Sequence, residues 1–255
     1  MSTPQDGQRT TAKQLYAKLE STRKVYTDRA EKCAELTIPM AFPKESDTSS
    51  TKYETPYQSI GARGVNNLTS KLMLALFPPN APFFRLSLGD EVRTQLGDDP
   101  ATVQEWESAL SKIERQITNY MESHQMRVTM NEAMTQLILA GNVLLFLPPK
   151  EGGMKLYRLN SYCLSRDGIG NTTEIVTKES IAYGALPPEA QRCIEGDNIE
   201  PHKAYDVYTH TYLDGEVYRS YQEVGDNIIS GTEQTYPKDA SPWIPLRLRK
   251  MDGES

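Results

Sequence analysis

Cysteine and histidine are scarce in this sequence, and the few copies present are widely separated. They occupy positions Cys33, Cys163, Cys193, His124, His202 and His210. There is no Cys-x-x-Cys pair and no His-Glu-x-x-His motif. A zinc site or a disulfide framework therefore does not fit, whereas a reducing compartment does. We predict that each cysteine is a small buried apolar residue, and Cys33 fits this best because it lies on an apolar helix stripe.

Long apolar runs are also missing. The most apolar segment has only six residues, from Leu72 to Phe77, and the pair Pro78-Pro79 ends it. A membrane-spanning helix needs about twenty apolar residues. The polar opening "MSTPQDGQRTTAKQ" does not resemble a signal peptide. We therefore expect no membrane partner.

The glycines of "GARGVNNLTSKLMLALFPP" resemble a phosphate loop only superficially. Gly61 and Gly64 are three residues apart, Lys71 lies seven residues beyond Gly64, and Leu72 follows it. A Walker loop needs G-x-x-x-x-G-K-[ST], so that backbone amides and the lysine hold the phosphates. The Gly-x-Gly-x-x-Gly fingerprint of dinucleotide sites is absent as well. We predict no nucleotide or other cofactor site in this segment.

Catalytic signatures are equally sparse. No Gly-x-Ser-x-Gly motif occurs, and Asp98-Asp99 lie in a turn where they are expected to cap the next helix. The formal net charge of −6 argues against a surface that coats nucleic acid. The interleaved pairs Tyr157-Arg158 and Tyr218-Arg219 are isolated. We predict no catalytic, cofactor-binding or metal-binding residue, and no enzyme.

What is present is a globular composition, with 24% charged and 38% hydrophobic residues. The first half reads as helical, with three capping boxes in which a threonine precedes Gln or Glu by three positions. These boxes are Thr11–Gln14, Thr102–Glu105 and Thr129–Glu132. The first opens a helix that reaches about Thr37. A further helix is predicted over Ile60–Phe77, and Gly141-Asn142 predicts a left-handed helix end.

Two helices carry apolar stripes at helical spacing. Members of the first stripe are Val65, Leu68, Leu72 and Leu76, and those of the second are Val103, Trp106, Leu110, Ile113, Ile117, Tyr120 and His124. We predict that Leu68, Leu72, Leu76, Trp106, Leu110, Ile113 and Ile117 are buried in one core. A coiled coil is the alternative for the longer stripe. His124 is expected at a polar helix terminus.

The first helix has a mixed-charge face with a basic excess. Its basic residues include Lys18, Arg23, Lys24, Arg29 and Lys32. Behind it, the polar segment Phe42–Pro56 is long enough to be a contact arm. Such a charged face is either solvated or meets another subunit.

The second half reads as strands. A strand follows Gly141-Asn142 in "VLLFLPP", two strands flank the turn Asp167–Asn171, and Asp214-Gly215 joins the clearest hairpin. Pro187–Ile194 predicts a short helix. The order of helices followed by antiparallel strands predicts an α+β fold. We divide the chain into a mainly helical segment, 1–142, and a β-rich segment, 143–255.

Several segments together resemble one family. "TIPMAFPKESDTSSTKYETPYQSIGARGVNNLTSKLMLALFPPN", "ILAGNVLLFLPP", "MKLYRLNSYCLSRDGIGN", "AYGALPPEAQRCIEG", "DVYTHTYLDGE" and "TYPKDASPWIPLRLRKMDGES" occur in this order. They are similar to the N-terminal part of the portal, or head-to-tail connector, proteins of short-tailed phages that encode their own RNA polymerase. The resemblance covers essentially the whole chain.

The resemblance implies a structural subunit and not an enzyme. It implies a dodecameric ring at a single capsid vertex in the virion, assembled in the host cytoplasm, through which a separate terminase pumps double-stranded DNA. Implied protein partners are further copies of itself, the major capsid and scaffolding proteins, the tail adaptor and internal core proteins. The family supplies no catalytic residue.

Members of this family are longer than this chain, so we expect an N-terminal wing portion here, with stem, clip, tunnel loop and crown beyond residue 255. The alternatives are a nucleic-acid-processing enzyme and an adaptor module that forms no ring. We further predict that the first helix and the Phe42–Pro56 loop contact an adjacent subunit through their charges.

Overall fold

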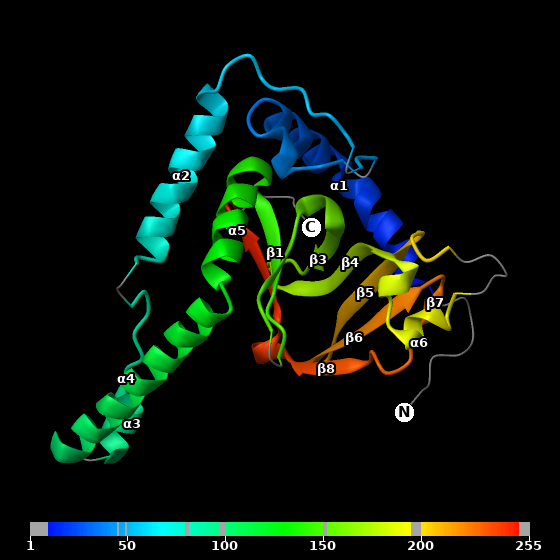
Figure 1. Ribbon diagram of the computed structural model, residues 1–255. Helices are drawn as coiled ribbons and strands as arrows, with labels where there is room; N and C mark the ends of the chain where they lie inside the picture. The colour runs from blue at the N-terminus through cyan, green and yellow to red at the C-terminus, as the bar shows by residue number, and fades with distance from the viewer. Residues whose placement is uncertain are drawn as a thin grey trace.

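Among the residues that the structure describes, five α-helices precede the strands. The computed structural model describes residues 10–44, 46–48, 50–79, 82–96, 100–149, 152–194 and 200–249. The helices are α1 (Ala12–Glu35), α2 (Ile60–Leu76), α3 (Asp90–Leu96), α4 (Pro100–Ser123) and α5 (Met126–Ala140), with the short α6 (Pro188–Gln191) between strands (Figure 1). Antiparallel strands follow from Asn142 onward, which confirms the predicted α+β fold.

The first capping box is present as predicted. The Thr11 hydroxyl accepts a hydrogen bond from the Gln14 backbone N–H at 3.3 Å, and the Gln14 side chain accepts one from the Thr11 N–H at 3.3 Å. Two of the N–H groups that a helix start leaves unpaired are thereby satisfied. At the other end of the helical half, Gly141 has φ +76°, which confirms the left-handed cap.

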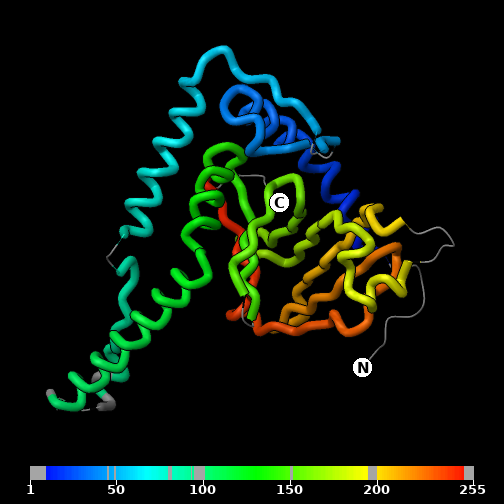
Figure 2. The backbone as a smooth tube through the Cα atoms, viewed as in Figure 1, coloured from blue at the N-terminus to red at the C-terminus, as the bar shows by residue number. Residues whose placement is uncertain are grey.

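The other two boxes do not cap a helix. α4 begins at Pro100 and α5 at Met126, so Thr102 and Thr129 lie inside helices. A capping threonine must have extended backbone, and neither has it. Gln125, with φ 53°, separates α4 from α5, and the two helices continue in nearly the same direction (Figure 2). The predicted cap Asp98-Asp99 lies outside the described residues.

Two antiparallel sheets form the β-rich half. The smaller has the order β2 (Lys155–Tyr157), β1 (Asn142–Phe146), β9 (Trp243–Arg247). The larger has the order β3 (Tyr162–Arg166), β4 (Thr172–Ala182), β5 (Ala204–Asp214), β6 (Val217–Val224), β7 (Asn227–Ile228), and β8 (Gln234–Pro237) also pairs with β6. The hairpin at Asp214-Gly215 is confirmed, with Gly215 at φ +65° and Asp214 opposite Val217.

Helix α1 lies against both sheets through small residues. Ala30 and Ala34 pack in one cluster with Leu144 and Trp243 of the smaller sheet, and Ala12 packs in another with residues of the larger sheet. Alanine side chains let the helix backbone come close to the strands. The buried Glu223 carboxylate on β6 also accepts the Ala12 N–H at 2.5 Å, so a negative charge sits at the helix N-terminus.

The predicted helical core is wrong in its location. Leu68, Leu76, Trp106, Ile113 and Ile117 are exposed, and Leu72 and Leu110 are only partly buried. The stripes lie on helices as predicted, and Leu72 of the first stripe packs against the buried cluster that includes Met130 and Met134 of α5. Helices α3 and α4, however, extend away from both sheets (Figure 1). The fully buried large side chains instead include Leu144, Leu145, Ile175 and Ile229, mostly on strands. No helix within the described ranges combines the length and apolarity that crossing a membrane requires.

The prediction for Cys33 is wrong as well. Its side chain is exposed, because Ala30 and Ala34 form the part of α1 that touches the core. Cys163 fulfils the prediction: it is 0% exposed, and burial raises the pKa of its thiol to about 12. Cys193 is intermediate in exposure.

Candidate functional site

The three histidines occupy very different environments. His124 follows the last residue of α4, where its Nδ1 lies 2.9 Å from the Tyr120 carbonyl oxygen and 3.0 Å from the Ser123 hydroxyl. This is the polar helix terminus that the sequence predicts. His202 lies exposed in a turn. Only His210 is nearly buried and contacts both an acidic side chain and a phenol.

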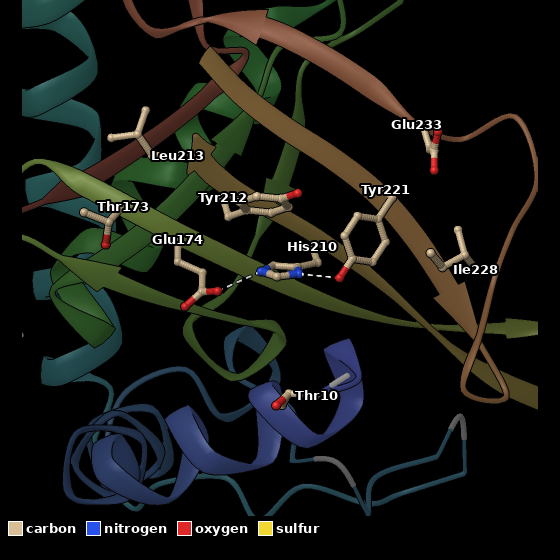
Figure 3. Close-up of a pocket in the computed structure, with 9 residues that line it drawn as sticks. All are labelled: Thr10, Thr173, Glu174, His210, Tyr212, Leu213, Tyr221, Ile228 and Glu233. Atoms are coloured by element: carbon tan, nitrogen blue, oxygen red, sulfur yellow. Dashed lines mark hydrogen bonds and ion pairs between the residues drawn. The ribbon is translucent and has the colours of Figure 1, made fainter. Parts of the chain in front are cut away.

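His210 sits at the centre of a polar cluster on the larger sheet. Its Nε2 lies 2.8 Å from Glu174 Oε1 on β4, and its Nδ1 lies 2.8 Å from the Tyr221 hydroxyl on β6 (Figure 3). The Tyr212 ring stands 5.2 Å from the imidazole, centroid to centroid. The cluster borders an open cavity of about 570 Å³ beside the start of α1, where Thr10 forms part of the wall.

The geometry of this cluster fits a structural link between three strands better than a catalytic site. Both imidazole nitrogens are engaged, and the groups they contact are a carboxylate and a phenol, with no serine or cysteine nucleophile in the cavity wall. Within the described ranges, no three His, Cys, Asp or Glu side chains are grouped so that they could hold a metal ion. The cluster therefore joins β4, β5 and β6 by side chains in addition to their backbone ladders.

Half of this cluster was accessible from the sequence. The Asp214-Gly215 turn sets a register in which His210 lies opposite Tyr221. Glu174 is 36 positions away from His210, and only the pairing of β4 with β5 brings it near. The sequence analysis named neither partner of His210.

Helix α4 carries a row of exposed apolar and aromatic side chains. Trp106, Ile113, Ile117 and Tyr120, which we call the α4 stripe, are all exposed, with Trp106 at 48% and Ile113 at 44%. With Val103 and Leu110 they recur at alternating spacings of three and four, as in a coiled-coil seam. Residues before α3 cover part of one flank, since the Leu86 N–H donates to the Glu114 carboxylate at 2.5 Å.

Helix α2 carries a second apolar surface. Ile60, Leu68 and Leu74, which we call the α2 face, are exposed, with Leu74 at 61%. The opposite side of α2 packs on α5, where Thr69 is buried and its hydroxyl lies 3.4 Å from that of Thr135. Exposed apolar side chains that gather on one side of a helix are candidates for contact with another molecule.

The charges of these two helices are opposite in sign. α2 contains Arg63 and Lys71 and no acidic residue, whereas α4 contains four glutamates against Lys112 and Arg115. A positive helix and a negative helix that both expose apolar side chains have complementary potentials.

The loop after α1 folds back on its own helix (Figure 2). Phe42 is buried in the core, and the Lys44 ammonium lies 2.8 Å from Glu35 and 3.8 Å from Glu31. Lys24, Arg29 and Lys32 remain exposed on α1, whereas Arg23 is partly buried and turned inward. Part of the expected charged contact surface is therefore used within the chain.

The chain is similar to known bacteriophage proteins. The family model described as "Bacteriophage head to tail connecting protein" matches residues 9–255. The portal protein of Escherichia phage T7 is 49% identical over 253 residues, and that of Enterobacteria phage T3 is 49% identical over 251; each alignment covers 96% of this chain and 47% of the relative. The portal protein of Enterobacteria phage SP6 is 28% identical over 258 residues, covering 97% of this chain and 48% of the relative. The chain thus spans about half the length of these relatives.

Proposed function

Because the chain belongs to the bacteriophage head-to-tail connecting protein family, we propose that it forms part of a portal subunit with a structural role and no catalysis of its own. The observation that carries this proposal is the match to portal proteins over 96% of the chain. Residues 1–142 and 143–255 would supply the helical and the β-rich parts of a wing region. The ring of such subunits, a dodecamer, would stand at one capsid vertex, bind capsid and tail proteins, and pass DNA driven by a terminase.

The apolar surfaces of α2 and α4 support ring formation. In a closed ring each subunit presents two different surfaces, one to each neighbour, and the two must be complementary. We propose that the α2 face of one copy meets the α4 stripe of the next. Each surface is apolar and exposed, and the two helices are opposite in charge.

Electron microscopy of the full-length protein tests the proposed function. We expect closed rings with a central hole. Incubation with DNA, Mg²⁺ and ATP should yield neither DNA cleavage nor ATP hydrolysis. Only monomers on the grid would favour an adaptor that forms no ring. Turnover that a single substitution abolishes would favour a nucleic-acid-processing enzyme.

The charged face of α1 is expected to make a smaller contribution to the rate of ring assembly, and this contribution can be measured separately. We propose that Lys24 and Arg29, both exposed, attract an adjacent subunit. The Lys24→Glu/Arg29→Glu variant should form rings several-fold more slowly at low salt and nearly normally at high salt, because salt screens charges on this scale. Light scattering during assembly measures the rate. Lys203→Glu/Lys238→Glu makes the same change of charge on exposed residues elsewhere. If both variants assemble alike, the α1 face is simply solvated.

A further inference from the structure

A second cavity, of about 340 Å³, lies between α1, β3 and β9. Three arginines line it: Arg23 on α1, Arg166 at the end of β3 and Arg247 at the end of β9. Its described lining contains no Asp or Glu side chain. Three arginines that are far apart in the sequence therefore line one cavity, and no carboxylate lines it with them.

Arg23 is the most unusual of the three. Its Nε and Nη2 atoms are buried, and neither has a hydrogen-bond acceptor among the described residues. These two N–H groups lie on the same side of a guanidinium, where they form the fork that binds two oxygens of one anion. The guanidinium carbon lies 5.6 Å from the centre of the Tyr162 ring. A buried donor with no acceptor in the protein is costly, and an anion in the cavity would supply the acceptor.

The other two arginines lie at the ends of strands, and the Arg166 side chain is also held by hydrogen bonds. Arg166 Nη1 donates to the Gly170 carbonyl oxygen at 3.0 Å and to the Thr172 hydroxyl at 3.4 Å. Arg247 lies opposite Asn142 in the ladder between β1 and β9, and Asn142 also lines the cavity. The strands therefore position the backbone of both residues, and the turn after β3 fixes the Arg166 guanidinium.

The electrostatics of the cavity wall agree with this arrangement. Burial raises the pKa of the Tyr162 hydroxyl, and Arg23 and Arg166 both act to lower it. Both guanidinium charges therefore act on the same hydroxyl. Glu20 on α1 opposes Arg23 in its effect on the pKa of the neighbouring Cys163, but it does not line the cavity.

We infer that this cavity is a phosphate-binding site. A carboxylate offers two oxygens in one plane and a single negative charge. A phosphate offers oxygens in tetrahedral directions and up to two charges, which suits three arginines arriving from a helix and two different sheets. The phosphate is either free in solution or part of a nucleic acid. This inference does not depend on ring formation.

Phosphate binding to the full chain, measured by calorimetry and by the thermal midpoint, tests this site. With ionic strength matched by chloride, inorganic phosphate should raise the midpoint. Arg23→Gln and Arg247→Gln should each weaken phosphate binding about tenfold or more, as expected for the loss of a charged hydrogen bond. Arg63→Gln removes an exposed arginine on α2 and should leave the affinity unchanged. Without phosphate, Arg23→Gln should raise the midpoint, because it removes a buried charge; this separates loss of binding from loss of folding.

Three further ligands identify the source of the phosphate. One ligand is a single-stranded oligonucleotide with a 5′-phosphate. If it binds about tenfold more tightly than its unphosphorylated form, and if this binding requires Arg23, the site recognises the end of a nucleic acid. Equal, Arg23-dependent binding of both oligonucleotides indicates backbone phosphates, and binding of inorganic phosphate alone indicates the free anion. If polyglutamate binds more tightly than phosphate and this binding requires Arg23, the ligand is an acidic protein segment and the phosphate inference is wrong. The inference would be refuted if phosphate raised the thermal midpoint no more than chloride does. It would also be refuted if Arg63→Gln weakened phosphate binding as much as Arg23→Gln does.

Discussion

Placing two charges on the α4 stripe should abolish ring assembly of the full-length protein while leaving the subunit folded. Trp106→Glu/Ile113→Glu removes two apolar side chains that are about half exposed in the single chain. In the proposed ring these side chains are covered by a neighbour, and burying such a side chain contributes about 1.5–3 kcal/mol. The substituted carboxylates would add the cost of burying unpaired charge. Every subunit would carry the defect at one of its contacts, so the effect is repeated around the ring.

A matched variant separates this effect from a general effect of added charge. Ser108→Glu/Ser111→Glu introduces the same two carboxylates at exposed positions on the opposite side of the same helix. We expect this control to form rings at the wild-type level in electron microscopy and in mass measurement by light scattering. Both variants should keep a thermal midpoint close to wild type as single chains, since exposed substitutions usually change stability by about 0.5 kcal/mol or less. Normal rings from Trp106→Glu/Ile113→Glu would remove the α4 stripe from the subunit interface.

The second large effect concerns the stability of the single chain. Leu144→Ala should lower the free energy of unfolding by about 2–5 kcal/mol, because Leu144 is 0% exposed in the cluster beneath α1 and its removal leaves a cavity. For a chain of this size the thermal midpoint should fall by roughly 4–20 °C. Leu74→Ala is the same chemical change at a position that is 61% exposed on the α2 face, and it should shift the midpoint by about 2 °C or less.

The same measurement decides where the core lies. Trp106→Ala should cost far less than Leu144→Ala in the single chain, although the sequence pattern predicts that Trp106 is buried. Calorimetry or circular dichroism of the three alanine variants under one set of conditions provides the comparison. A loss for Trp106→Ala equal to that for Leu144→Ala would mean that α4 packs into a core of its own chain, and the α4 stripe would then be no free surface.

Local features of the fold were predictable because their causes are local. A threonine with glutamine three positions later satisfies N–H groups at one helix start, and Gly141 adopts a backbone that other residues avoid. The Asp214-Gly215 turn sets the register of its own hairpin. The other two capping-box motifs have the expected residue types but do not cap a helix. Each helix starts before its threonine, which therefore has helical backbone. A capping motif therefore works only where the chain is not already helical.

By itself, the sequence determined the helices and their apolar stripes, the hairpin, the order of helices and strands, and the resemblance to phage connector proteins. Periodicity shows that a helix has an apolar side, but it carries no information about which molecule covers that side. Only the tertiary structure decided that the alanines of α1 reach the core while the α4 stripe remains exposed. It alone also brought Glu174 to His210, and Arg23 to Arg166 and Arg247. These residues meet through the pairing of distant strands and the packing of α1, and contacts over such separations leave no short-range pattern in the chain.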